Sequence, residues 1–371
     1  MKSLFLGGLL VLATALLMPL QAQTYTFYVA AESEDRVYRI AFDAETRTST
    51  IENEIIVGVY PQEIEGPHGI GVDASGEYWF VSLGHGVPFG TLYKYETGTD
   101  RRVDSVELGL FPASLDISSE TGWVYVVNFD LHGPHEPSTV SVVDGHTMEE
   151  LDRIDTGIMP HGSRLSADQR YQYHVSMMTD ELMEIDAFTL EMSRRLPLTD
   201  TPSSMHAGHH SHGHGQETAE PMQHATVSPT WASPHPFEPY VYIAGNRSNE
   251  ILAVNRESWQ VKHRWSTSAR GPYNLEPTHS GDRLVVTYKG EGAVGFWDLE
   301  TGTEIATLPT SRKVTHGVVI SPDDRFAFVS VEGIGGEPGS VDIFDLETYE
   351  LADVVEIGKQ ASGIAFWKMT P

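Results

Sequence analysis

The sequence predicts an all-β protein, a seven-bladed β-propeller whose blades are four-stranded antiparallel sheets. Three observations support this fold class. A turn signature returns about every 45 residues, a spacing typical of propeller blades. Short segments of alternating apolar residues, rich in β-branched and aromatic side chains, fill each interval. The chain also begins inside one repeat and ends with the part of that repeat that its beginning lacks.

The turn signature is Asp or Asn followed three residues later by Thr or Ser. The acidic or amide side chain closes a tight turn by hydrogen bonding to backbone N–H groups, which explains its fixed place in each unit. The seven segments, the second of them degenerate, are Asp43–Thr46, Tyr95–Thr97, Asp144–Thr147, Asp186–Thr189, Asn255–Ser258, Asp298–Thr301 and Asp345–Thr348. The one long interval, between the fourth and fifth segments, contains an insertion at about residues 200–223.

One unit shows all four strands in order. Residues 68–73, 77–82, 91–96 and 102–109 read as strands, separated by Gly, Asp and Ser. The same pattern returns in other units, at residues 124–129 with 139–144, 240–246 with 251–255, and 326–332 with 340–345. No long amphipathic helix is indicated.

The two ends of the chain are expected to share one blade. Residues 26–32 and 36–43 read as second and third strands without a first, and residues 362–368 read as a first strand without the others. Pairing these segments closes the ring and leaves no free edge at the hub. We therefore expect residues 1–22 to be a signal peptide and residues 23–371 to form one propeller domain.

The repeat resembles that of the YVTN family of seven-bladed propellers. The motif is matched by Val124-Tyr125-Val126-Val127-Asn128, and Ser141–Asp144 followed by Thr147 matches the rest of the unit. The resemblance covers nearly the whole mature chain and implies the fold. It does not specify a function, because such propellers serve as binding modules, scaffolds and enzymes.

Composition limits the partners and the compartment. Lys2, the apolar run of residues 4–18 and Ala22 are typical of an export signal, so we expect a periplasmic or secreted protein. There is no cysteine, which excludes disulfides, thiolate ligands and covalent c-type haem. The net charge of −28 argues against nucleic acid as a partner. We expect a monomer that does not insert into a membrane after the signal is removed.

Histidines recur at the predicted start of the innermost strand. This position holds, from the closing blade onward, Ser362, His68, Ala113, His161, His224, Tyr273 and His316. The face of the ring where inner strands begin is called the histidine face below. Twelve of the 17 histidines fall on it: His68, His85, His132, His135, His161, His206, His209, His210, His212, His214, His224 and His316.

Four imidazoles on one ring predict a metal site at the hub, formed by His68, His161, His224 and His316. Imidazole binds Zn, Cu, Fe or Ni, and we favour Cu or Zn. Nearby strand ends offer second-shell groups or extra ligands, namely Glu32, His85, Asn128, Asn246 and Glu332, together with Tyr273 at the hub itself. A single histidine at the ring position would more often only form a hydrogen bond to a neighbouring carbonyl group.

The insertion carries His206, His209, His210, His212 and His214 with two methionines, and no residues able to build a core. It is interpreted as a loop that collects metal for the hub. The alternative is an insertion that arose without a function and whose histidines have only incidental affinity for metal.

Three functions stay open. The first is a propeller that binds a transition metal for metal handling or metal-dependent redox chemistry. The second is a metal-independent scaffold whose histidine face binds a protein or an envelope polymer. The third is a lactonase-type hydrolase with Ca²⁺ at the hub, which a histidine ring fits poorly because calcium prefers oxygen ligands. No nucleophile elbow, zincin helix or phosphate loop is present, so the sequence does not decide whether the protein is an enzyme.

Overall fold

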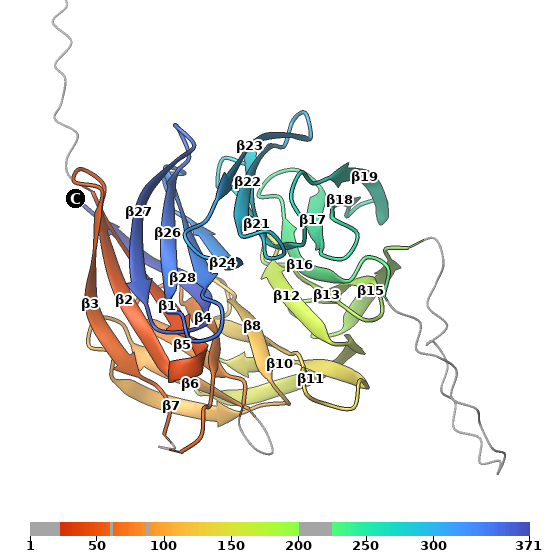
Figure 1. Ribbon diagram of the computed structural model, residues 1–371. Coiled ribbons are helices and arrows are strands. Elements are labelled where there is room, and N and C mark those ends of the chain that lie inside the picture. The colour runs from red at the N-terminus through yellow and green to blue at the C-terminus, as the bar shows by residue number, and fades with distance from the viewer. Residues whose placement is uncertain (1–22, 60–61, 86–89, 200–224) are drawn as a thin grey trace, which may run out of the picture.

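The computed structural model describes residues 23–59, 62–85, 90–199 and 225–371. It confirms the predicted fold class: seven four-stranded antiparallel sheets stand around a central axis (Figure 1). The one helical element among the described residues is a 3-10 turn, η1 (Glu32–Glu34). No helix in these residues has the length and apolar character required to cross a bilayer.

The blades follow one another along the chain. The first four are built from β28 (Ala361–Thr370), β1 (Thr24–Ala31), β2 (Arg36–Asp43) and β3 (Thr48–Ile56); β4 (Pro67–Val72), β5 (Tyr78–Leu83), β6 (Thr91–Glu96) and β7 (Arg102–Glu107); β8 (Pro112–Ile117), β9 (Trp123–Asn128), β10 (Pro137–Asp144) and β11 (Glu149–Ile158); and β12 (Pro160–Leu165), β13 (Tyr171–Ser176), β14 (Glu181–Asp186) and β15 (Met192–Pro197).

The last three are built from β16 (Pro229–Pro234), β17 (Tyr240–Gly245), β18 (Glu250–Asn255) and β19 (Gln260–Ser266); β20 (Pro272–Pro277), β21 (Arg283–Tyr288), β22 (Ala293–Asp298) and β23 (Thr303–Pro309); and β24 (Val314–Ile320), β25 (Phe326–Glu332), β26 (Gly339–Asp345) and β27 (Glu350–Ile357). The first strand of each sheet is the inner one.

The predicted turns form as expected. In the first, Asp43 Oδ1 accepts hydrogen bonds from the backbone N–H of Thr46 at 2.8 Å and from its hydroxyl at 3.0 Å. Asp144, Asp186, Asn255, Asp298 and Asp345 accept the corresponding N–H group in their own turns. These turns join third and fourth strands at the face opposite the histidine face.

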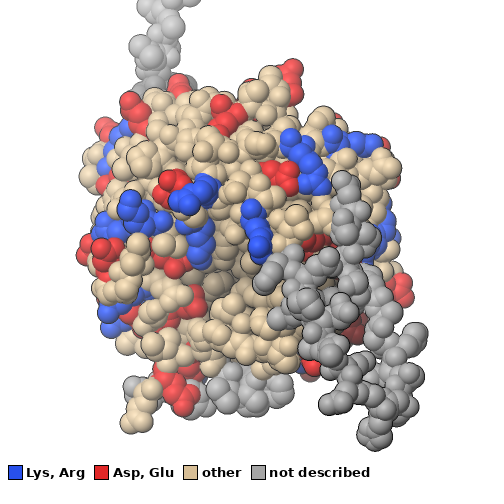
Figure 2. All heavy atoms as spheres, turned by 45° about the vertical axis from the view of Figure 1, so that its right-hand side comes forward, with Lys and Arg blue, Asp and Glu red and all other residues tan. Residues whose placement is uncertain are grey.

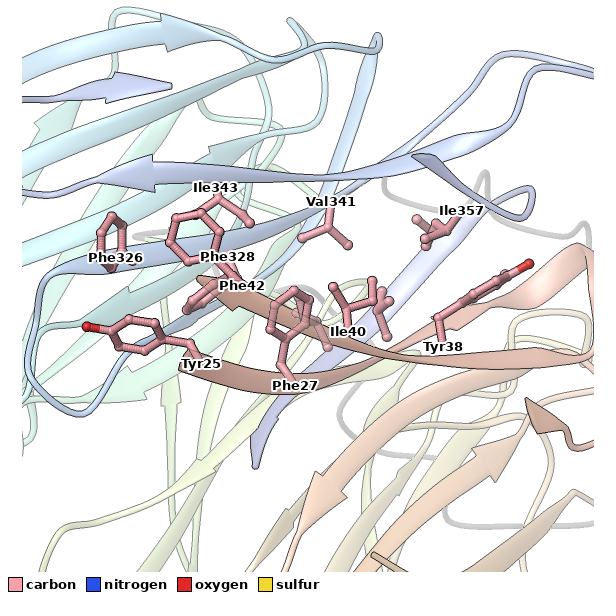
Figure 3. Packing of buried hydrophobic residues seen from close by; sticks show 14 residues of the cluster. Tyr25, Phe27, Tyr38, Ile40, Phe42, Phe326, Phe328, Val341, Ile343 and Ile357 are labelled. Atoms are coloured by element: carbon pink, nitrogen blue, oxygen red, sulfur yellow. The ribbon is translucent and has the colours of Figure 1, made fainter. Parts of the chain in front are cut away.

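Ring closure also follows the prediction. The C-terminal strand β28 pairs antiparallel with β1, with Thr24 opposite Thr370 and Phe27 opposite Phe366. In Figure 1 the blue C-terminal strand β28 accordingly lies beside the red N-terminal strand β1 in one sheet. Apolar side chains then fill the space between this blade and its neighbour: Tyr25, Phe27 and Phe42 pack against Phe326 and Phe328 (Figure 3).

The hub is tight because small residues follow the ring position. A Cβ on Gly69 would stand 1.9 Å from the Ala113 carbonyl oxygen of the next blade, and one on Gly363 would stand 2.1 Å from the His68 carbonyl oxygen. Hydroxyl groups join the blades at the same level. Thr287 donates to the His316 carbonyl at 2.8 Å, and Ser114 donates to the His161 carbonyl at 3.1 Å. The backbone of each ring residue is therefore fixed by the neighbouring blade.

Candidate functional site at the hub

Three of the four predicted ring histidines meet at the hub. His68, His161 and His316 come from β4, β12 and β24, and all three line one cavity of about 40 Å³ on the axis. That volume exceeds the roughly 10–15 Å³ that one water needs, so a hydrated ion or a few waters fit. Sequence positions far apart in the chain thus contribute to one small space.

Blade 5 departs from the prediction. Its inner strand β16 begins at Pro229, so Thr230, and not His224, occupies the ring position. Assigning the strand start to His224 was wrong because the preceding insertion obscured the repeat. His224 and the loop histidines His206, His209, His210, His212 and His214 lie outside the described residues.

Thr230 has a role of its own at the hub. Its carbonyl oxygen accepts a hydrogen bond from His161 Nδ1 at 2.7 Å. Because a carbonyl can only accept, the proton of His161 sits on Nδ1 and the lone pair on Nε2. The Nε2 atom is the one that faces Tyr273.

Tyr273, from β20, joins two of the histidines. Its hydroxyl oxygen lies 3.1 Å from His161 Nε2 and 3.4 Å from His316 Nε2. The single phenol proton can serve only one of them, and the lone pair on His161 Nε2 makes His161 the acceptor. Burial raises the pKa of Tyr273, with Lys289 acting in the opposite direction, and so favours the neutral phenol.

His68 is held from behind by a buried carboxylate. Its Nδ1 lies 2.9 Å from Glu32 Oε2, and the other carboxylate oxygen lies 3.2 Å from His85 Nε2. Burial opposes the charge of Glu32, yet the two histidines lower its pKa to about 2. With Nδ1 engaged, Nε2 of His68 is the nitrogen left to face the axis.

Burial also sets the charge state of the other two imidazoles. It lowers the pKa of His161 to about 3, helped by repulsion from His68, and it lowers the pKa of His316 well below its ordinary value, helped by Lys289. Both rings are therefore neutral at pH 7. Neutral imidazole is the form that binds a metal ion.

A lysine that the sequence reasoning missed also reaches the hub. Lys289 follows β21, and its Nζ lies 2.9 Å from Glu332 Oε1 and 4.4 Å from the centre of the Tyr273 ring. Glu332 is in turn 3.9 Å from His316 Nε2. Glu32 and Glu332 thus bring two carboxyl groups to the hub, and Lys289 brings one ammonium group.

Six rings enclose this level of the axis. Consecutive centroids in the order His68, His316, Tyr273, His161, Phe129, Phe111 and back to His68 are 5.3, 4.9, 5.3, 4.8, 5.8 and 5.7 Å apart. Phe111 directly precedes β8, and Phe129 directly follows β9, one residue beyond the observed end of that strand. Four of these rings carry a polar nitrogen or oxygen, and the two phenylalanines make the remaining side of the circuit apolar.

The remaining predicted residues fall into two groups, those that support the hub and one that lies outside it. His85 and Glu332 support hub residues as described, and Asn246 donates to the Pro272 carbonyl at 3.1 Å, directly before Tyr273. Asn128 is not part of the hub. Its amide donates to Thr139 Oγ1 at 2.8 Å and Ser141 Oγ at 2.9 Å and so joins β9 to β10.

The three histidines do not form a ready-made ligand cluster. Within residues 23–59, 62–85, 90–199 and 225–371, no group of three or more His, Asp or Glu side chains has the spacing of a metal site. The Tyr273 hydroxyl lies between two of the imidazole nitrogens instead. Binding of a metal by all three would require that hydroxyl to move or to join the ligands.

Comparison with known proteins supports the fold and leaves the function open. No family model and no curated protein matches the chain, so membership of the YVTN family is not confirmed. Among solved structures, the chain is similar to a protein of Lactobacillus plantarum determined by a structural genomics consortium. The TM-score is 0.70 at 13% sequence identity, over 93% of this chain and 100% of that one. At this identity the likeness shows a shared propeller-like fold and no more.

Proposed function

We propose that this propeller binds a transition-metal ion, Cu or Zn in preference to Fe or Ni, at the hub through His68, His161 and His316. The observation that supports the proposal is the way the rings are held from behind. Glu32 binds Nδ1 of His68, and the Thr230 carbonyl binds Nδ1 of His161. Metal-binding histidines are typically oriented in this manner, so that Nε2 is presented to the ion.

Tyr273 is the fourth group of the proposed site. Its oxygen is already 3.1 and 3.4 Å from two of the ligand nitrogens, so a small shift would place it beside the ion. With the cavity lined by imidazoles and no thiolate in the chain, nitrogen and phenol oxygen are the donors available. This donor set suits Cu or Zn.

The hub carboxylates make a calcium-dependent hydrolase the weaker alternative. Glu32 is occupied by two histidines and Glu332 by Lys289. Calcium needs six to eight oxygen ligands, and these two side chains already have partners.

Metal titration tests the proposal. The protein is stripped with a chelator and titrated with Zn²⁺ or Cu²⁺ in a variant lacking residues 203–215, so that the loop histidines add nothing. We expect about one equivalent to bind tightly, as measured by mass spectrometry after desalting. In the same background, His68→Gln, His161→Gln and His316→Gln together are expected to reduce retained metal at least tenfold.

His279→Gln is the matched control, because this histidine is exposed and lies on the opposite face. It should retain the full equivalent. Equal metal content in the hub variant and the control would overturn the proposal, provided that both proteins unfold at similar temperatures. The scaffold function would then be favoured.

A further inference from the structure

The hub cavity extends away from the histidine face. Each inner strand begins at that face with the ring residue and runs toward the opposite face, so later residues of the strand lie deeper along the axis. Every described residue that lines the cavity is either a ring residue or lies one to three positions after one, for example Ile70, Leu115 and Val318. Phe111 and Phe129, at the histidine face, are not among them.

Aromatic rings close the histidine-face end of the axis. In the circuit of six rings, consecutive centroids are at most 5.8 Å apart. Phe111 is 5% exposed, Phe129 7% and His161 2%, so little of the circuit touches solvent. The exposed His132 covers the circuit from outside, with its ring 5.7 Å from that of Phe111. The described residues at this face therefore leave the hub covered.

The other end of the cavity adjoins a wider pocket. This pocket has a volume of about 350 Å³ and lies where the inner strands end, with the exposed Ala167 at its rim. Four residues line both spaces, namely Ile70, Leu115, Arg164 and Ile364. Because the same side chains border the pocket and the cavity, they form a throat between the opposite mouth of the ring and the hub.

Arg164 is the movable member of the throat. The three apolar members are buried, and each packs in a different hydrophobic cluster. The Arg164 side chain is partly exposed instead, with its Nε 3.3 Å from Glu276 Oε2 and its guanidinium over the Trp231 ring at 4.8 Å. An ion pair in contact with solvent contributes little to stability, so the guanidinium can swing aside at small cost.

We infer that small molecules reach the hub from the opposite mouth, past Arg164, and that the histidine face is not the entrance. The inference goes beyond the proposed metal site, because it applies equally to water, a metal ion or a small organic molecule. The cavity of about 40 Å³ admits only a few non-hydrogen atoms. A ligand of the hub would thus arrive from the face opposite the one to which the sequence assigns most histidines.

A cysteine reporter tests the route, because the chain contains no cysteine of its own. Ser114→Cys places a thiol of similar shape on the wall of the hub cavity, and Asn274→Cys is a second reporter on the same wall. Methyl methanethiosulfonate, a small uncharged reagent, converts the thiol into a mixed disulfide. Mass spectrometry of the full-length protein gives the rate constant. A chelator is present throughout, so the outcome does not depend on whether the hub binds metal.

Substitutions at the two ends of the axis identify the entrance. With the Ser114→Cys reporter, Ala167→Trp adds an indole at the rim of the opposite pocket and should slow labelling about tenfold. His132→Trp adds the same group outside Phe111 and is the matched control, which should leave the rate unchanged. Arg164→Ala widens the throat and should speed labelling about tenfold, although loss of a nearby positive charge would by itself disfavour the reactive thiolate.

Three results would overturn the inference. The first is slower labelling in His132→Trp than in Ala167→Trp, which would place the entrance at the histidine face. The second is an equal rate in the reporter protein and in all three variants. The third is no labelling of either reporter, even with Arg164→Ala, because the hub would then be closed at both ends.

Discussion

At the residue scale, burial decides what each histidine does. His174, in β13, is fully buried outside the hub, and its Nδ1 donates to Gln172 Oε1 at 3.0 Å. Burial, with a smaller contribution from Arg195, lowers the pKa of His174 to about 3. The folded protein thus holds this ring neutral at a pH where the unfolded chain protonates it.

The stability of the protein should therefore fall as the pH drops below 6.5. Between pH 6.5 and about 3, only the unfolded state takes up the proton, at about 1.4 kcal/mol per pH unit. His161 and His316 act in the same direction. We measure the free energy of unfolding by urea titration at pH 7 and at pH 5.5. The decrease between the two pH values should be about 1 kcal/mol smaller for His174→Gln than for the wild type. The exposed His146→Gln should show the same decrease as the wild type, and the same decrease for His174→Gln would contradict the argument.

At the element scale, the inner strands show what the sequence could reveal about the hub. Five of them begin with proline directly before the ring residue, at Pro67, Pro112, Pro160, Pro229 and Pro272. In blade 5 this signal, Pro229, identifies Thr230 and not His224 as the ring residue. Lys289 and Phe111 had no such signal, because they lie in connections that differ from blade to blade.

The packing of elements where the ring closes should be sensitive to cavities. Phe328 in β25 is fully buried, with its ring 4.7 Å from that of Phe27 (Figure 3) and 6.2 Å from that of Phe366. Phe328→Ala should lower the free energy of unfolding by about 3–5 kcal/mol, as measured by denaturant titration. Phe237→Ala, at a side chain that is 70% exposed, should change it by less than about 0.5 kcal/mol. Similar values for both variants would mean that this interface is not a tightly packed core.

At the scale of the whole molecule, the sequence predicted the blade number, the strand order and the closure, because each depends on a repeated local pattern. The hub was predicted only in part. Its histidines follow the repeat, whereas the contacts that orient them, from Glu32 and the Thr230 carbonyl, depend on which blades lie next to each other.

The surface shows basic and acidic side chains interspersed on the face in Figure 2.

Closure should be required for a stable ring. A chain ending at Gln360 lacks β28 and leaves β1 with an unpaired edge and an uncovered apolar face. We expect this truncation to associate into larger species on size-exclusion chromatography and to lose its cooperative thermal transition. Removal of Pro371 alone, which is exposed, should change neither property. A monomeric, cooperatively melting truncation would show that the other six blades suffice.

The pairing of β28 with β1 also has a consequence for biosynthesis. The strands of the other six blades all lie between β1 and β28 in the chain, so translation makes β1 long before its partner. A nascent chain therefore carries an open seam beside β1 until β28 has emerged from the ribosome.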